Sequence, residues 1–496
     1  MDALTRWLAP LFPGLAAKRV AAQAHLVAAQ RYYEAVNLSN YRPRRGNGAS
    51  ADTVMDRAKG RLREYARWLD ENHDLAVGIL DDLVTNIVGV GVGVEPLTKA
   101  ADGTALNALN DQLRDLWLEF WQRPDVTGEF SGTELERLVC RSFLRDGEVF
   151  AQHVQSRNAR YRGPIPYALE PLESDFVPFD LTNDVYTHGV QKNAWGQPIA
   201  YVVYKQHPGD LRGGTSLDTK IISAENILHL KLTRRFHQTR GVSIFHAVLN
   251  RLDDVKDYEE SERIAARIAA ALTAYIKRNG EYETTLNTDG SRAFEMSPGM
   301  VFDNLFPGED VGVIKSDRPN AKLEEFRNSQ LRAVAAGTGS RFSSIAKNYN
   351  GTYSAQRQEL IEGSQHYRRV FVYLREQFYL PVWRRFIDAA QLAGALRIPL
   401  NVNPLSLYRP EFRQPALPWI DPAKEATAFE KFIAMGVKSR WQIIRDIGGD
   451  PRQVDAQLEA DPLDVRPVPD SNSPTQPNAP EGEPDDDEQP KQQEAA

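Results

Sequence analysis

Residues 242–278 read VSIFHAVLNRLDDVKDYEESERIAARIAAALTAYIKR, a stretch that contains neither proline nor glycine. Apolar residues recur in it at steps of three and four, which is the period of an α-helix. We predict one unbroken helix here, roughly 55 Å long at 1.5 Å per residue. Ser243, just after Gly241, is a suitable N-terminal cap, and Asn279-Gly280 is a C-terminal pair that tolerates left-handed geometry.

A helix of this length needs a reason, because globular helices average about three or four turns. Its apolar stripe has eight members: Ile244, Val248, Leu252, Val255, Ile264, Ile268, Leu272 and Ile276. The middle of the helix, residues 253–263, is charged almost all round. A helix that is polar in its middle and apolar towards both ends fits a ring in which each copy packs on its neighbours. Four members of the stripe are the expected contacts between subunits: Leu252, Ile264, Ile268 and Leu272.

Upstream of this helix the sequence indicates a mixed helix and strand lobe. Helical periodicity runs through residues 52–86, 106–121 and 131–145. The alternating valines and glycines of residues 87–94, IVGVGVGV, predict a strand that another backbone approaches closely. Between residues 149 and 232, five short segments split by turns predict an antiparallel sheet: FAQHVQ, IPYALEPL, GVQKN, PIAYVVYKQ and ILHLKL. The fold class that follows is α+β.

Downstream, residues 281–316 read as strands and turns, and residues 323–336 as a second helix. Gly337-Thr338-Gly339-Ser340 ends that helix, and a polar loop follows to residue 351. A further long helix begins at Thr352 or Ser354 and runs to about residue 393. Pro381 is expected to kink it, because proline lacks the amide donor and crowds the preceding turn.

The C-terminal part carries three helix-start signals. Asp421-Pro422 and Asp450-Pro451 each pair a capping carboxylate with a proline in the first turn, and Ser439 with Gln442 fits the capping box. Three short helices are therefore expected between residues 421 and 459. Beyond residue 462 the composition is mostly Pro, Asp, Glu, Gln, Ser and Asn, so a disordered tail is expected there.

Composition limits the function classes. At 496 residues the chain exceeds what one hydrophobic core supports, so several lobes are expected. Cys140 is the only cysteine, which excludes an intramolecular disulfide framework and a cysteine-rich metal site; its apolar surroundings predict a buried thiol. No apolar run reaches the ~18 residues of a membrane span, so we expect a soluble, intracellular protein without membrane contact.

The charge of the chain is unevenly placed. From residue 461 onward there are ten acidic and two basic residues, a local charge of −8, which leaves +1 of the formal −7 for residues 1–460. A nearly neutral body does not grip nucleic acid tightly, so any contact with a polyanion is expected to be weak or local.

Fragments that resemble catalytic motifs carry little weight. Ser344-Ile-Ala-Lys347 matches S-x-x-K, but the accompanying S-D-N and K-T-G are absent from the sequence, and there is no P-loop. The nine histidines are dispersed without metal-ligand spacing, and acidic pairs such as Asp253-Asp254 and Glu259-Glu260 read as a solvated or intersubunit helix face. We predict no catalytic residues, no metal and no cofactor: the chain reads as a structural part, not an enzyme.

The order of these elements resembles the portal proteins of tailed bacteriophages, most closely the lambda-like portal family. Five local segments, in the expected order over roughly residues 40–460, carry the resemblance: Asn86-Ile-Val-Gly89-Val-Gly91, Asp146-Gly147-Glu148-Val-Phe150, Gln238-Thr-Arg240-Gly241-Val242, Leu305-Phe-Pro307-Gly308-Glu309, and Asn348-Tyr349 followed by Tyr353-Ser354-Ala355-x-Arg357. Each segment alone is weak, whereas five together are specific.

The resemblance implies a ring-forming portal-type fold. Its parts would be a basic N-terminal arm (1–50), an α/β wing (51–240), a first stem helix (241–280), a strand-rich clip (281–318), a second stem helix (319–336), a tunnel loop (337–352), a kinked wing helix (353–394), a helical crown (395–462) and the acidic tail (463–496). The implied function is a dodecameric channel at one capsid vertex of a virion or prophage particle, assembled in the host cytoplasm, for packaging and ejection of double-stranded DNA.

The same resemblance implies partners and site residues. The partners would be further copies of the chain, double-stranded DNA bound without sequence specificity, the terminase large subunit, head-tail adaptor (connector) proteins and the major capsid or scaffold proteins. Five tunnel-loop residues would face DNA: Arg341, Lys347, Asn348, Tyr349 and Asn350. Tyr353, Ser354 and Arg357 would support the loop, although Arg357 could instead pair with a carboxylate of a neighbouring subunit.

Two alternatives from other classes stay open at this point. One is a capsid-associated enzyme, either a nuclease using clustered carboxylates or an acyl hydrolase using Ser344. The other is a ring-shaped adaptor that never contacts DNA.

Overall fold

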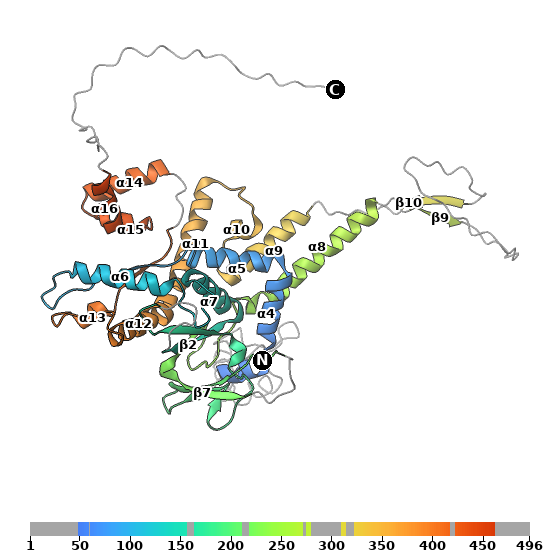
Figure 1. The fold of residues 1–496 in the computed structure, drawn as a ribbon. Helices are drawn as coiled ribbons and strands as arrows, with labels where there is room; N and C mark the ends of the chain where they lie inside the picture. The colour runs from blue at the N-terminus through green and yellow to red at the C-terminus, as the bar shows by residue number, and fades with distance from the viewer. Residues whose placement is uncertain are drawn as a thin grey trace, which may run out of the picture.

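A computed structural model describes residues 48–58, 60–155, 163–210, 218–270, 274–278, 309–313, 322–416 and 422–461. They form a central body of helices and sheets, from which α8 (Leu249–Ala270) leaves as a rod with α9 (Leu323–Thr338) beside its inner half (Figure 1). A small group of three helices lies apart from the rod: α14 (Pro422–Ala434), α15 (Arg440–Asp446) and α16 (Pro451–Ala460). The mixed helix and strand content confirms the predicted α+β class.

The body's helices follow the predicted segments with two breaks. The helical pattern at residues 52–86 becomes α3 (Ala51–Ala58), α4 (Arg61–Asn72) and α5 (Asp74–Ile87), and His73 between the last two is extended at φ −124°, ψ 110°. Both later segments are confirmed as α6 (Asn107–Trp121) and α7 (Gly132–Asp146). α7 begins with a capping box in which the Ser131 and Glu134 side chains bond each other's backbone amides.

Two antiparallel sheets stand where one was expected. The first has the order β3-β2-β8, with β3 (Ala168–Leu172), β2 (Glu148–Val154) and β8 (Ile227–Lys231). The second has the order β4-β5-β6-β7, with β4 (Tyr186–Thr187), β5 (Val190–Lys192), β6 (Pro198–Tyr204) and β7 (Thr219–Ser223). Short 3₁₀ turns η2 (Ser174–Phe176) and η3 (Ala224–Asn226) follow β3 and β7. All five predicted strand segments contribute a strand, and β4 and β7 are additional.

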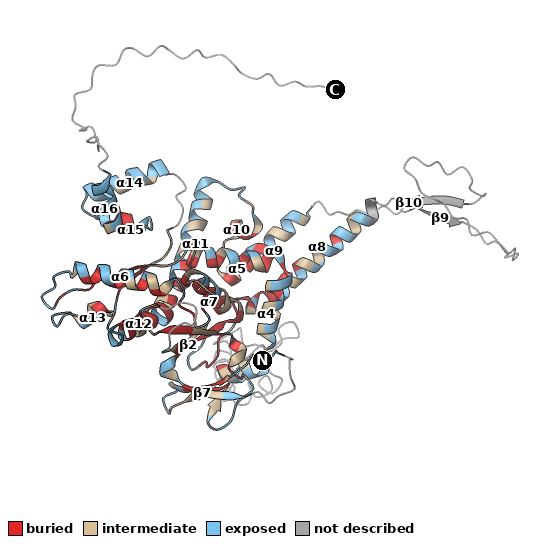
Figure 2. Ribbon diagram, in the orientation of Figure 1, coloured by how far each residue is buried: buried red, intermediate tan, exposed pale blue. Residues whose placement is uncertain are grey.

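The main core lies where α5, α7, α12 (Leu380–Leu392) and β2 meet, and burial is concentrated there (Figure 2). Trp117 stacks on Trp121 and makes edge contact with Phe386, with ring centroids 4.7 and 5.1 Å away. Cys140 is fully buried in this core, and burial raises the pKa of its thiol. The predicted buried structural cysteine is therefore confirmed.

The strand prediction for residues 87–94 is wrong except at its end. α5 continues to Ile87, a turn follows, and β1 is confined to Gly93–Glu95, paired with β11 (Glu411–Arg413). Gly89 and Gly91 have φ of +56° and +121°, so these glycines serve the turn rather than a strand. What approaches Gly91 closely is a side chain rather than the predicted backbone: a Cβ there would lie 2.8 Å from the Thr133 hydroxyl oxygen.

The unbroken helix predicted for residues 242–278 is also wrong at both ends. Ser243 does act as a cap, but of the 3₁₀ turn η4 (Ile244–Ala247): its hydroxyl accepts from the Phe245 amide at 3.1 Å. Val248 then departs from helical geometry (φ −122°, ψ −3°) before α8 begins. Beyond α8, β9 (Ala274–Arg278) pairs antiparallel with β10 (Glu309–Val313). Periodicity alone cannot reveal such a strand, because its hydrogen bonds go to a segment about 35 residues away.

The long C-terminal helix is interrupted where expected. Thr352 caps α11 (Tyr353–Leu374), accepting from the Ala355 amide at 3.3 Å. A π-helical turn, η5 (Arg375–Tyr379), then leads into α12, and the Leu380 amide donates to the Arg375 carbonyl. Pro381 has no amide to continue the regular ladder, so the predicted disturbance takes the form of a π turn.

The remaining short elements are α10 (Phe342–Ala346) and α13 (Pro404–Leu407). The predicted caps of α15 and α16 are confirmed: Ser439 with Gln442 forms the capping box, and Asp450 accepts from the Arg452 amide at 3.0 Å. Within the described residues no helix combines the length and apolar character needed to cross a membrane. The predicted arm, the acidic tail and most of the predicted clip lie outside the described residues.

Candidate functional site

Two of the motif segments meet at the base of the rod. The Gly147 carbonyl accepts from the Leu232 amide at 2.7 Å, and the Leu232 carbonyl accepts from the Val242 amide at 3.1 Å. A Cβ on Gly241 would lie only 1.9 Å from the Gly147 oxygen, so the two backbones touch. This contact fastens the start of the η4–α8 segment to the end of α7 and the start of β2.

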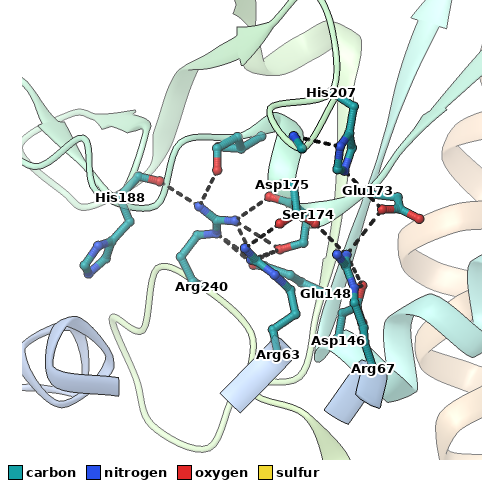
Figure 3. Close-up of polar contacts among 12 residues, drawn as sticks. Arg63, Arg67, Asp146, Glu148, Glu173, Ser174, Asp175, His188, His207 and Arg240 are labelled. Carbon is teal, nitrogen blue, oxygen red and sulfur yellow. Dashed lines mark hydrogen bonds and ion pairs between the residues drawn. The ribbon is translucent and has the colours of Figure 1, made fainter. Parts of the chain in front are cut away.

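Arg240 lies at the centre of this junction and is fully buried (Figure 3). Its Nε donates to both carboxylate oxygens of Glu148, at 2.8 and 3.0 Å. Nη1 donates to the carbonyls of Val177 (3.1 Å) and His188 (3.0 Å), while Nη2 donates to the carbonyl and hydroxyl of Ser174 at 3.0 and 3.2 Å. All three guanidinium nitrogens are thus engaged with protein acceptors.

Glu148 is as completely surrounded as Arg240. Besides the guanidinium, it accepts from the Ser174 hydroxyl (2.6 Å) and the Gly241 amide (2.9 Å), and its Oε2 lies 3.1 Å from His229 Nε2. Burial alone would raise the pKa of this carboxyl, but the charge of Arg240 and the bond to His229 hold the pKa well below its usual range. Burial lowers the pKa of His229 to about 4, so its imidazole is neutral near pH 7.

An outer layer of charges surrounds this buried pair. Arg63 pairs with Asp175 at 2.9 Å, and Arg67 of the same helix reaches Asp146 at 2.7 Å and Asp175 at 2.6 Å (Figure 3). Glu173, Asp175 and His207 bring ligand atoms within 4.8 Å of one another, an arrangement that could hold a metal ion. Two guanidiniums already neutralise these carboxylates, so the arrangement is better explained as an ion-pair network.

This centre forms a joint: it holds elements of the same subunit together and does not offer its donors to another molecule. A catalytic or ligand-binding arginine must offer donors to another molecule, whereas those of Arg240 are directed at Glu148 and at backbone carbonyls. The centre connects β2, η2, the strand turn at His188 and the base of α8. Sequence reasoning identified both motifs but assigned them no chemistry, because Glu148 and Arg240 are 92 positions apart.

The predicted tunnel loop is shorter than expected. α9 continues to Thr338 and ends at Gly339 with φ +78°, and α10 occupies five residues of the predicted loop. Ser344, expected in the polar loop, lies in α10 and is buried at 8% exposure. Two stretches without regular structure remain, residues 339–341 and 347–352, and the loop tip at residues 347–351 lies in the second.

Arg341 belongs to the body rather than to the free loop. Its Nη2 donates to Asp82 of α5 at 3.1 Å, and its guanidinium carbon lies 5.8 Å from the centre of the Tyr367 ring. The side chain is 18% exposed. This placement argues against a DNA-facing role, because the guanidinium is held between Asp82 of α5 and Tyr367 of α11.

The other four predicted DNA-facing residues lie together at the loop tip. Lys347, Tyr349 and Asn350 are exposed and Asn348 is half-buried. Lys347 adopts φ +50°, a left-handed conformation rare for a residue with a side chain. The Asn348 side chain accepts from the Asn350 amide at 3.0 Å, so the turn is held by its own polar groups.

The three predicted support residues begin α11 and are exposed. Arg357 Nη1 donates to the Tyr353 hydroxyl at 3.3 Å, and Lys424 of α14 lies 5.7 Å from the centre of the Tyr353 ring. The structure assigns Ser354 no side-chain bond of its own among the described residues. From the same helix, Gln356 donates to the carbonyls of Tyr349 and Gly351 and so is the side chain that supports the loop.

The predicted intersubunit stripe divides into two parts. Leu252 is fully buried in the subunit's own core, so the expectation that it contacts another subunit is corrected: its partners are within the chain. Ile264 is 47% exposed near the far end of α8. The Ile268 side chain and residue Leu272 lie outside the description. α8 and α9 are held together by Tyr258 and Phe326, with ring centroids 4.8 Å apart, and by a Glu259–Arg327 ion pair.

Two sequence comparisons agree on one family. A sequence model described as "Phage portal protein, lambda family" matches residues 40–370. The "Probable portal protein" of Halomonas phage phiHAP-1 is 25% identical over 448 residues, covering 86% of this chain and 84% of that protein. Among solved structures, a chain of "Neck of empty GTA particle computed with C6 symmetry" matches with a TM-score of 0.50 and 13% identity, over 80% of this chain and 94% of that one. A chain of "Neck of native GTA particle computed with C12 symmetry" gives 0.49 at 13% identity, over 78% and 94%.

Proposed function

Since the chain belongs to the lambda family of phage portal proteins, we propose that about twelve copies form a closed ring whose axis is a channel for double-stranded DNA. The observation that carries this proposal is the family match itself, which spans residues 40–370 and so includes the α8–α9 pair and the loop at residues 347–351. No catalytic role is assigned to the chain: Ser344, the only nucleophile that the sequence suggested, is buried.

The joint at Arg240 supports this role mechanically. A channel wall built from projecting helices must keep each helix at a fixed angle to its own subunit while DNA passes. Here α8 begins directly after a segment fixed by a buried ion pair and by backbone contact at Gly147 and Gly241. The α8–α9 pair would line the channel, with Ile264 among the groups that reach a neighbouring subunit.

The loop tip supports weak contact with DNA. A conduit must not hold its cargo, because a ring of strong phosphate contacts would stall movement. Each subunit offers one loop cation, Lys347, with Asn348, Tyr349 and Asn350 as adaptable polar neighbours. Such groups touch phosphates without reading sequence. We place the loop tip at the channel wall on this basis.

The wider role follows from membership of the family. The ring would occupy one vertex of the capsid, assembled in the host cytoplasm from contacts with capsid or scaffold proteins. The region that includes β9 and β10 would first meet the terminase large subunit and later the head-tail adaptor proteins. The α14–α16 group would form the crown inside the capsid.

Imaging tests the ring directly. Negative-stain micrographs of the purified full chain are expected to show end-on rings with a central hole. Ile264→Asp should reduce the fraction of rings, because it places a charge on an apolar contact. Arg263→Gln, at an exposed position about 100° round the helix, should not. A compact monomer at every concentration would refute the proposal.

A packaging assay tests the loop. Lys347→Glu repeats a negative charge around the channel and is expected to lower DNA packaging while rings still form. Arg397→Glu, at an exposed position on another part of the body, is the matched control. Normal packaging with the Lys347 variant would favour a ring adaptor without DNA contact.

A further inference from the structure

A pocket of about 440 Å³ lies where the end of β8, the end of α9 and the C-terminal half of α11 come together. One part of its wall is apolar and includes Phe143, Ile244 and Val370. The other part is cationic and comprises Lys231, Arg234 and Arg369, with His366 beside them. None of the described residues that line it is a carboxylate, so its electrostatic character is positive.

Two of these cations face no described carboxylate. Arg369 donates from Nη2 to His366 Nδ1 at 3.0 Å, and neither Arg369 nor Arg234 has an ion-pair partner among the described residues. Lys231 differs, since its ammonium donates to the carbonyls of Gln238 and Thr239, both at 3.0 Å. Burial and the two nearby arginines lower the pKa of His366, which keeps its imidazole neutral and able to accept from Arg369.

By contrast, several other arginines of the body face carboxylates. Arg63, Arg67, Arg141, Arg145, Arg240, Arg341 and Arg445 all have acidic partners within the chain. Exposed arginines without such partners, gathered around a hollow, are an arrangement suited to an anionic ligand. Because part of the wall is apolar, the ligand should also carry apolar groups that can be buried against it.

We propose that this cationic pocket binds the acidic run at residues 485–488, DDDE, in the C-terminal segment of the same chain. The run is flanked by Pro484 and Pro490, whose rings supply apolar surface for the wall beside the cations. Charge complementarity is strong, because residues 461–496 carry ten acidic and two basic side chains. The inference does not depend on ring formation or on the proposed channel.

A peptide fits the pocket better than duplex DNA does. A duplex is far wider than a pocket of this volume, so its phosphates would meet only the rim and leave the apolar wall uncovered. A tethered segment also needs little intrinsic affinity, because a short flexible link gives an effective concentration in the millimolar range.

The segment is long enough to reach. α14 contacts the first turn of α11 through Lys424 and Tyr353, and sixteen residues of α11 separate Tyr353 from Arg369, about 24 Å at 1.5 Å per residue. The 24 positions from residue 461 to residue 485 span up to about 80 Å when extended and average about 27 Å as a flexible coil. The extended length exceeds the separation along α11 by about 50 Å, which leaves length for the path from residue 461 past the α14–α16 group (Figure 1).

Electron paramagnetic resonance on the full chain tests the docking. A nitroxide is attached at Gln489→Cys; the only native cysteine, Cys140, is fully buried and serves as the labelling blank. At about 50 mM salt we expect an immobilised component in the spectrum, which about 1 M salt should remove by screening. Arg234→Glu/Arg369→Glu should remove it at low salt, whereas the matched pair Arg384→Glu/Arg397→Glu, also exposed, should leave it unchanged.

A peptide competition gives a second measurement. The decapeptide EGEPDDDEQP, residues 481–490, should release the labelled tail, and the same peptide with every acid replaced by its amide should not. The proposal would be overturned if the unmodified chain showed no immobilised component. It would also be overturned if that component survived the Arg234→Glu/Arg369→Glu change. Unchanged circular dichroism of the pocket variant confirms that its loss of signal is not unfolding.

Discussion

Replacing Arg240 by methionine tests whether the buried joint holds the rod to the body. Methionine keeps most of the apolar stem and removes the guanidinium, so Glu148 loses its counter-ion in a site where its side chain is 3% exposed. Three backbone carbonyls, of Val177, His188 and Ser174, lose their donors in the same change.

The expected cost follows from these losses. Breaking a buried ion pair by removing one partner costs about 3–5 kcal/mol, because the remaining charge stays desolvated. Proton uptake by Glu148 or His229 limits the penalty, since it removes or balances that charge. For a unit of about 150–250 residues, 1 kcal/mol corresponds to about 2–4 °C in Tm, so Arg240→Met should lower the first thermal transition by about 10 °C.

Thermal unfolding of five proteins separates the charge effect from the packing effect. Arg240→Met/Glu148→Gln removes both charges and should be more stable than Arg240→Met alone. With Glu148→Gln measured as the second single variant, the coupling energy should be about 2 kcal/mol or more. The control is Arg452→Met, which breaks a pair with Asp111, a residue whose side chain is 55% exposed. Such a surface pair is worth about 0–1 kcal/mol, so its Tm should move by about 3 °C at most. A Tm of Arg240→Met within about 2 °C of the unmodified protein, or a double variant less stable than the single one, would refute the role assigned to the joint.

Three further predictions concern single groups of the core. Burial raises the pKa of Glu136 to about 8, so between about pH 4.5 and 8 the native state keeps a proton that the unfolded chain releases. The free energy of unfolding should therefore fall as pH rises through that window. Glu136→Gln should flatten the plot of Tm against pH. The pKa of His229 lies at about 4, so stability should be lost as pH falls from about 6.5 towards 4; His229→Gln should reduce this acid loss, and an unchanged acid limb would contradict the assignment. Gly241→Ala places a Cβ 1.9 Å from the Gly147 carbonyl oxygen and should lower the soluble yield and Tm sharply, while Gly78→Ala, with open space around its Cβ, should gain up to about 1 kcal/mol in urea unfolding.

Features decided by neighbouring residues were predictable from the sequence. The caps at Ser439 and Asp450 are examples, because each depends on a side chain and an amide two or three positions away. The interruption before Pro381 was predictable for the same reason, since a missing amide acts on the adjacent turn. The α+β class followed from the change of period between residues 149 and 232.

Features decided by distant partners were not predictable. Residues 274–278 continue the helical pattern of α8, yet they form a strand because residues 309–313 offer a ladder. Ile87–Val94 alternates like a strand, yet its first residue closes a helix and its glycines turn the chain. Arg341 reads as a loop cation, yet Asp82, more than 250 positions earlier, holds it in the body. In each case the deciding contact lies far outside any sequence window.

The joint at Arg240 shows why a motif can identify a family without revealing its own purpose. The segments around Gly147-Glu148 and Arg240-Gly241 contain two glycines and two opposite charges, and each residue makes sense only against the other segment. The glycines allow the backbones to touch, and the charges compensate each other at a depth where either alone would be costly. Residues that contact DNA loosely can vary, whereas a buried pair between touching backbones fixes all four positions at once. We therefore expect the residue types of these two segments to be set by the need to anchor α8 to the body rather than by contact with DNA.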